Sequence, residues 1–278
     1  MADQQKYSGK LRDAHVLIIG GSSGLGLGIA EACLEHGARV TISSSQSARV
    51  QDAVAKLQNA YPSAASKVAG ETCNLGDEST IEKEVKRLFE NAGKVDHVVY
   101  TAGDKLAVMP LGEITIEKAK QAGMAQTVFP TLEYANLIFS GMVRFFGPLV
   151  VARYASEYLT PGPRSSFTLT NSSLSEKPML NWTVVAAFGG GISSMTRNLA
   201  LDMAPIRVNT VSPAAVDTEL WSDIPDDQKN GWFEQLANAT TTGRVGQVGD
   251  VVEAYLYAMK DTNLSGSILS TNGGFLLR

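Results

Sequence analysis

Two hydrophobic periods alternate along the first half of the chain. Short runs of mostly apolar residues, typical of strands buried on both faces, are separated by longer segments with an apolar position every three or four residues, typical of helices. The runs predict strands at 15–19, 39–42, 67–73 and 97–101, and the segments between them predict helices at 25–35, 48–60 and 78–92. Strands joined by helices in this way lie parallel in one sheet.

The second half of the chain repeats this alternation. It predicts helices at 143–158 and 184–203, and strands at 166–170, 207–211 and 267–270. We therefore expect an α/β fold: a single Rossmann-like, doubly wound domain with roughly seven parallel strands and helices on both faces of the sheet. In such folds ligands bind beyond the carboxyl ends of the strands.

The turn after the first predicted strand carries the strongest chemical signal. It is rich in glycine and serine and leads directly into a helix, so free backbone N–H groups and the positive end of the helix dipole face an anion. This arrangement is typical of the pyrophosphate site of a dinucleotide. The alternative is a tight turn with a purely structural role. The residues expected at the phosphates are Gly20, Ser22, Ser23, Gly24, Leu25 and Gly26.

The end of the second predicted strand indicates which dinucleotide is bound. NAD sites usually carry a carboxylate about 20 residues beyond the glycines, where it binds the ribose hydroxyls. Here no acidic residue occurs between positions 35 and 52, and Arg49 is close enough in sequence to pair with a 2′-phosphate. The predicted cofactor is therefore NADP(H), held by Ser43, Ser44, Ser45 and Arg49. The alternative is a polar loop followed by a solvated arginine.

Composition narrows the classes of function. The chain has 278 residues, of which 44% are hydrophobic and 19% charged. No low-complexity tract or Pro-rich linker divides it, so we expect one domain over residues 1–278. A formal net charge of −4 and the lack of any Lys/Arg run argue against a nucleic-acid partner.

Cysteine and histidine placement excludes other classes. Cys33 and Cys73 lie in apolar contexts and provide neither a disulfide framework nor a thiolate metal site. The three histidines are far apart in sequence without ligand-like spacing, so we expect no metal. No secretory signal and no apolar run of about 20 residues is present, and we expect a cytoplasmic protein with no membrane partner.

Several motifs resemble those of the short-chain dehydrogenase/reductase (SDR) family, whose members are one-domain Rossmann enzymes of about this length. The three glycines of the turn match its cofactor glycines, and the Thr-Ala-Gly at 101–103 resembles its Asn-Ala-Gly turn. The segment 211–218 resembles the one that embraces the nicotinamide, with Ala214 replacing the usual glycine. The resemblance implies further cofactor contacts from Asn74, Leu75, Ala102, Gly103, Pro213, Val216 and Thr218.

The catalytic pair of the SDR family is missing from its expected place. In the family a Tyr protonates the substrate carbonyl, and a Lys four residues later lowers the pKa of that Tyr. Alignment on residues 195–200 puts these positions at Val185 and Gly189, and the nearest aromatic, Phe188, has no hydroxyl. The same alignment places Ser172 at the family's catalytic serine, with Ser173 as the alternative. Either ordinary carbonyl reduction has been lost, or the substrate needs no strong proton donor.

Residues 101–104, 144–147 and 197–202 resemble a fungal secondary-metabolism branch of the family that lacks the Tyr/Lys pair. This branch includes enzymes that reduce a cyclic iminium or azadiene with NADPH and guide an intramolecular Diels–Alder cyclisation of an indole alkaloid. The resemblance implies a pocket in which Arg144 orients a polar group and Trp182 lies against a planar ligand. One departure is Met179, which stands where the cyclising relatives have a carboxylate; Glu176 is the nearest acid.

Ser172, Arg144 and Trp182 are therefore the candidate catalytic residues. Each has a structural alternative: a turn cap for Ser172, an interface or ion pair for Arg144, and a wall of the core for Trp182. Asp104 and Lys105 follow the fourth predicted strand and would supply a proton or a cation, unless they belong to a solvated loop.

Two longer segments, 113–130 and 219–238, are expected to form extra walls over the substrate, and the second matches the family's mobile substrate loop. Its Trp221, Trp232 and Phe233 would close on a large apolar ligand or form a subunit contact. The resemblance also implies a homo-oligomer. Three functions stay open: an NADPH-dependent reductase of a bulky, hydrophobic natural-product intermediate, a non-redox cyclase or isomerase, and a binding protein that senses NADPH.

Overall fold

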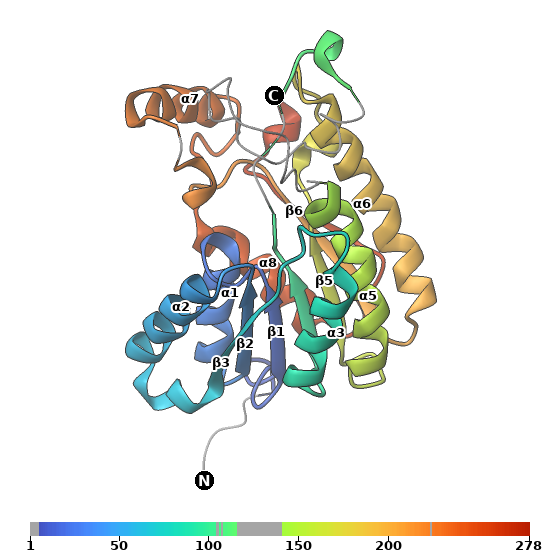
Figure 1. Cartoon of the computed structure of the whole chain (residues 1–278). Coiled ribbons are helices and arrows are strands. Elements are labelled where there is room, and N and C mark those ends of the chain that lie inside the picture. Colours follow the sequence, from blue (N-terminus) through green and yellow to red (C-terminus); the bar gives the residue numbers. More distant parts are fainter. Residues whose placement is uncertain (1–5, 104–105, 107, 116–140, 223) are drawn as a thin grey trace.

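The structure is a computed structural model that describes residues 6–103, 106, 108–115, 141–222 and 224–278. Seven strands form one sheet in the order β3-β2-β1-β4-β5-β6-β7, and every neighbouring pair is parallel (Figure 1). The predicted α/β fold class is confirmed. The strands are β1 His15–Ile19, β2 Arg39–Ser44, β3 Val68–Thr72, β4 His97–Tyr100, β5 Ser166–Thr170, β6 Arg207–Pro213 and β7 Ile268–Thr271.

Helices lie on both faces of the sheet, as expected for right-handed crossovers between parallel strands (Figure 1). Three short helical turns border the region discussed below: a π-helix at Met142–Phe146 and 3₁₀ turns at Ser173–Ser175 and Glu219–Trp221. The longer helices are α1 Gly24–Glu35, α2 Ser47–Ala60, α3 Ile81–Ala92, α5 Gly147–Tyr158, α6 Thr183–Asp202, α7 Asp226–Asn238 and α8 Val248–Lys260.

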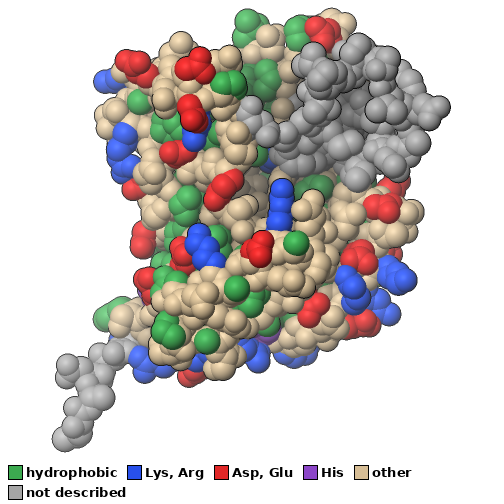
Figure 2. All heavy atoms as spheres, turned by 60° about the vertical axis from the view of Figure 1, so that its left-hand side comes forward, with side chains coloured by type: hydrophobic (Ala, Val, Ile, Leu, Met, Phe, Trp, Pro, Cys, Tyr) green, Lys and Arg blue, Asp and Glu red, His purple; other side chains and the backbone are tan. Residues whose placement is uncertain are grey.

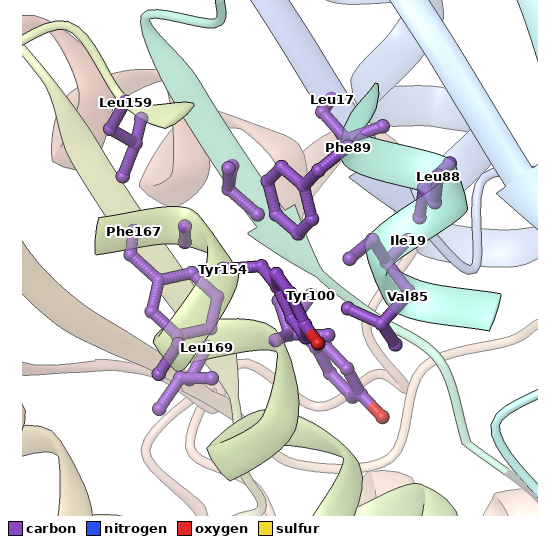
Figure 3. Packing of buried hydrophobic residues seen from close by; sticks show 14 of the residues in the cluster. Leu17, Ile19, Val85, Leu88, Phe89, Tyr100, Tyr154, Leu159, Phe167 and Leu169 are labelled. Atoms are coloured by element: carbon purple, nitrogen blue, oxygen red, sulfur yellow. The ribbon is translucent and has the colours of Figure 1, made fainter. Parts of the chain in front are cut away.

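The sheet separates two hydrophobic clusters. Alternate residues of β1 point to opposite faces: Leu17 joins the cluster covered by α3, α5 and α6, while Ile18 joins the cluster covered by α1, α2 and α8. Figure 3 shows Phe89 of α3, Tyr154 of α5 and Phe167 of β5 in the first cluster. Full burial of such side chains contributes about 1.5–3 kcal/mol each, which fixes the helices against the sheet.

A buried arginine ties the last helix to the sheet. Arg207 of β6 is 3% exposed and donates to the carbonyl oxygens of Ala258 (2.6 Å) and Met259 (2.8 Å) in the last turn of α8. Burial lowers the pKa of this guanidinium. Because the carbonyls at a helix C-terminus lack partners within the helix, the guanidinium satisfies them and anchors the last turn of α8 beside the first residue of β6.

The structure departs from the sequence prediction in three places. Helix α8 was not predicted, and the segment expected as a loop at 219–238 holds a 3₁₀ turn and α7. The helix predicted at 143–158 begins as a π-helix before α5. Most of the other predicted wall, 113–130, lies outside the described residues. Among the helices the structure describes, none is long and apolar enough to cross a membrane.

Candidate active site

The segments at the carboxyl ends of the strands surround an open cavity of about 1320 Å³. It lies where the strand order reverses between β1 and β4, the place where doubly wound sheets bind ligands. Of the residues predicted to contact the cofactor, and of Ser172, Arg144 and Trp182, all but Ser43 line this cavity. Ser43 is 1% exposed within β2, and its carbonyl oxygen accepts hydrogen bonds from the N–H groups of Gly20 (2.9 Å) and Gly21 (3.0 Å). These two hydrogen bonds hold the glycine turn against β2.

The glycine turn is held too tightly for side chains. Gly20 has φ +90°, a left-handed conformation that glycine adopts without strain. A Cβ on Gly26 would overlap the carbonyl oxygen of Gly20, so α1 approaches the turn only because Gly26 lacks a side chain. A Cβ on Gly20 would overlap the backbone of Ala102, so the same holds for the turn and the segment after β4. The hydroxyl of Thr101 donates to the carbonyl oxygens of Ile19 and Gly20, both at 3.2 Å, and so binds the segment after β4 to the glycine turn. We call the glycine turn and the start of α1 the cradle.

The N-terminus of α1 opens onto the cavity. Ser23 is the N-cap residue of α1, yet its side chain makes no capping hydrogen bond. The N–H of Gly24 instead donates to Oε2 of Glu219 at 2.9 Å. An anionic oxygen therefore already stands at the helix end where a phosphate oxygen would be favoured.

Two cations lie at the end of the cavity formed by β2 and α2. Ser44 and Ser45 line this end together with Arg49 and Lys56, both of which are solvent-exposed. Arg49 was predicted; Lys56 was not. The spacing in the sequence could have identified Lys56, because a residue seven positions after Arg49 lies on the same face of a helix.

Arg144 lies against the turn after β4. A Cβ on Gly103 would come within 2.8 Å of one guanidinium nitrogen of Arg144, so the glycine makes room for the arginine. The π-helix at Met142–Phe146 supplies this arginine, and both residues line the cavity. Pro213, Val216 and Thr218 line it from β6 and the segment after β6. Asp104 and Lys105 lie outside the described residues.

Ser172 and Trp182 also lie at the cavity, and both serve as N-cap residues. The hydroxyl of Ser172 accepts a hydrogen bond from the N–H of Leu174 at 3.3 Å, so its turn-capping role is confirmed alongside its place on the wall. Trp182 is the residue before α6. Ser173, the alternative serine, also lines the cavity but is only 2% exposed. Met179 lies on the wall, while Glu176 is exposed and does not line it.

An amide that the sequence analysis missed, that of Asn171, lies beside Gly189, the position that the alignment compared with the family's lysine. Neither Val185 nor Gly189 lines the cavity, and no tyrosine does so within the described part of the chain. Asn171, which lines it, donates from Nδ2 to the carbonyl oxygen of Gly189 (3.0 Å) and to Oγ of Ser193 (2.9 Å). A Cβ on Gly189 would lie 2.9 Å from Oδ1 of Asn171. Phe188 stacks on Phe145 with ring centroids 5.9 Å apart.

The segment after β6 is held together by its own contacts. Lys229 forms an ion pair with Asp217 at 2.9 Å, and Nε1 of Trp221 donates to the carbonyl oxygen of Val216 at 2.8 Å. The rings of Trp221 and Trp232 meet edge to face with centroids 4.6 Å apart. Because Trp221 and Trp232 both line the cavity, this segment forms one of its walls.

Charge around the cavity is mixed. Its acidic lining residues among those described are Asp52, Glu219 and Asp250, and Asp250 is paired with Arg244 at 2.6 Å. Acidic and basic side chains are interspersed over the face shown in Figure 2. Within the described ranges, no three His, Cys, Asp or Glu side chains are grouped to hold a metal ion. Burial raises the pKa of the free thiols of Cys33 and Cys73 to about 12.

A family model described as an SDR-like Rossmann domain matches residues 7–139 and 130–278. The chain belongs to the short-chain dehydrogenase/reductase family. It is 42% identical over 285 residues to the short-chain dehydrogenase/reductase fsr5 of Gibberella fujikuroi, with all of both chains covered. It is 36% identical over 282 residues to the short-chain dehydrogenase/reductase malC of Malbranchea aurantiaca, again over all of both chains.

A solved structure of the MalC reductase/Diels–Alderase from Malbranchea aurantiaca has the same fold. It superposes with a TM-score of 0.87 at 35% sequence identity and covers 98% of this chain and 100% of that one. The similarity to fungal SDR proteins confirms the resemblance stated from the motifs.

Proposed function

We propose that this SDR protein is an NADPH-dependent reductase that transfers hydride to a bulky, largely apolar small molecule, either an iminium or a conjugated system. The observation that carries this proposal is the composition of the cavity. A cradle that suits a dinucleotide opens onto an aromatic and apolar wall, and no tyrosine lines it among the described residues.

The residues at the cradle fit NADPH, which supplies the hydride when bound. The N–H groups at the start of α1 and the hydroxyls of Ser22 and Ser23 suit the pyrophosphate. Arg49 suits the 2′-phosphate because a guanidinium makes charge-assisted hydrogen bonds to phosphate oxygens. No carboxylate follows β2 directly to hold a free ribose diol, as NAD sites usually require.

The lack of a tyrosine among the described lining residues limits the substrate. Reduction of a ketone places negative charge on oxygen and needs a proton at that atom. An iminium carbon instead accepts hydride and leaves a neutral amine, so the protein needs only to bind, orient and exclude water. Trp182 would lie against a planar ring system, and the guanidinium of Arg144 would fix a polar group beside it.

A second candidate is cyclisation without net redox change, which would need only a cavity that holds the substrate folded. The similar MalC protein is described as both a reductase and a Diels–Alderase, which favours this candidate. The wall after β5 argues against it, because Met179 occupies the place where a carboxylate was expected and Glu176 is directed elsewhere. We therefore rank hydride transfer first.

The test is a single-turnover measurement of absorbance at the reduced-nicotinamide band. The purified protein with NADPH is mixed with an aldehyde, a conjugated ketone or a cyclic iminium. We expect NADPH to be oxidised in the presence of the iminium or the conjugated ketone, and not in the presence of the aldehyde. Oxidation of NADPH by the aldehyde alone would contradict the proposal. If NADPH is not oxidised but a diene-bearing iminium cyclises faster, the second candidate is favoured.

A further inference from the structure

The N-terminus of α1 is bonded to a carboxylate from a distant part of the chain. Oε2 of Glu219 accepts from the N–H of Gly24 at 2.9 Å, and the two residues are 195 positions apart. A Cβ on Gly24 would lie 3.5 Å from Cβ and Cγ2 of Thr218. The segment after β6 therefore stands directly over the glycine turn, with a charged oxygen on the helix end.

This segment presents Glu219 in a defined position. Thr218 is the N-cap of the turn Glu219–Trp221, and its hydroxyl accepts from the N–H of Leu220 at 3.4 Å. The indole of Trp221 donates to the carbonyl oxygen of Val216, and Asp217 is paired with Lys229 of α7. The carboxylate is thus attached to a wall of the cavity that has its own internal contacts.

A phosphate and this carboxylate compete for the same donor. A single N–H group makes one strong hydrogen bond, and two anions placed together repel each other. If the pyrophosphate of a dinucleotide binds at the start of α1, then the Glu219 carboxylate must leave the N–H of Gly24.

We infer that the Glu219–Gly24 hydrogen bond is an autoinhibitory contact: Glu219 holds the pyrophosphate position in the cofactor-free protein, and NADPH entry displaces it together with residues 217–222. This inference rests on the proposed cofactor. It couples cofactor binding to the shape of the substrate site, because residues 218–222 line the cavity in which the cofactor and the substrate would both bind. The wall facing the substrate is then set only after NADPH has bound.

The contact raises the apparent Kd for NADPH, since a binding-competent state that is only partly populated binds proportionally more weakly. Interactions of this kind at an exposed helix N-terminus change such an equilibrium by about 2- to 5-fold. Glu219→Ala removes the carboxylate, and with it both the negative charge and the acceptor for the Gly24 N–H. Glu219→Asp keeps the charge but shortens the side chain by one methylene, so the carboxylate no longer reaches the N–H of Gly24. Glu234→Gln is the matched control, because Glu234 is an exposed acid on α7 that does not line the cavity.

The experiment measures NADPH binding by cofactor fluorescence and, without cofactor, hydrogen exchange at the Gly24 amide. We expect Glu219→Ala and Glu219→Asp each to lower the Kd by about 2- to 5-fold and to speed exchange at Gly24, with Glu234→Gln unchanged in both. A lower Kd for Glu219→Ala but not for Glu219→Asp would overturn the contact and leave only a general charge effect. Equal binding by all four proteins would also overturn it. If neither the wild type nor the variants bind NADPH, the proposed function fails first and this inference with it.

Discussion

At the scale of single residues, the sequence identified glycines whose role depends on the conformation of the backbone. Gly20 and Gly26 were identified because a phosphate turn needs positive φ and close approach, and the structure brings both to the cavity. Asn171 could not be identified in this way. Its importance comes from Gly189, 18 residues later, whose missing side chain leaves the space that the amide occupies.

The first prediction at this scale concerns Gly24. Gly24→Asp would place a second carboxylate beside the helix N-terminus, and like charges repel, so NADPH affinity should fall roughly 100-fold. Aspartate tolerates the left-handed φ of +51° at this position better than most residues, so the fold should persist. Binding is measured by fluorescence titration, and the melting temperature checks folding. Gly24→Ala is the uncharged control, and an unchanged affinity in Gly24→Asp would contradict the cradle.

The second concerns Arg49. Arg49→Ala should weaken NADPH about 10-fold through loss of a charge-assisted hydrogen bond to the 2′-phosphate, while NADH affinity stays nearly constant. The two cofactors differ only in that phosphate, so NADH serves as the internal control in the same titration. Equal losses for both cofactors would show that Arg49 does not read the 2′-phosphate.

At the scale of elements, most helices and strands were predicted, and α7 and α8 were not. Strand β5 is found at the predicted residues, and α1 and α2 start within one residue of prediction. The unpredicted α8 does carry a signal, since Val251, Tyr255 and Met259 recur every four residues and are buried. Helix α7 carries less, because Leu236 is its one buried residue.

Helix α6 allows a matched test of the Asn171 contact. Gly190 is exposed with no atom within 4 Å of a Cβ, so Gly190→Ala should raise the free energy of unfolding by about 0.5–1 kcal/mol through better helix propensity. Gly189→Ala should instead lower it by about 1–2 kcal/mol, because its methyl group would crowd Asn171 and Ser175. Urea unfolding measures both.

The double variant Asn171→Ala/Gly189→Ala controls for other effects of the methyl group. It should lose less stability than the sum of its two single variants, because removing the amide removes the crowding. Strict additivity would mean that the amide and the glycine do not interact.

At the scale of the whole molecule, the parallel sheet followed from alternating elements, while polar contacts between distant segments did not. The hydrogen-bond acceptors of Arg207 lie more than 40 positions away, in helix α8 and in the loop before β5. A single sequence does not specify which distant segments come together around a buried side chain. The cavity illustrates both cases: its location follows from topology, and the Glu219 contact does not.

The pH dependence of global stability tests one of these buried contacts. His97 of β4 is 3% exposed and its Nδ1 lies 2.9 Å from Oγ of Ser166 on β5. Burial is the main cause that lowers the pKa of His97 to about 4, with the nearby charge of Arg207 adding to it. In the unfolded chain a histidine titrates near 6.5, so below that pH the unfolded state takes up a proton that the folded state does not. The free energy of unfolding should therefore fall between pH 6.5 and 4, by up to about 3 kcal/mol from this residue, and none of this loss should occur above pH 7. His97→Asn removes this titration and should reduce the slope of the urea-unfolding free energy between pH 7 and 4.5, leaving the part due to His15, whose pKa burial also lowers. A variant profile as steep as the wild type would show that His97 is not the group responsible.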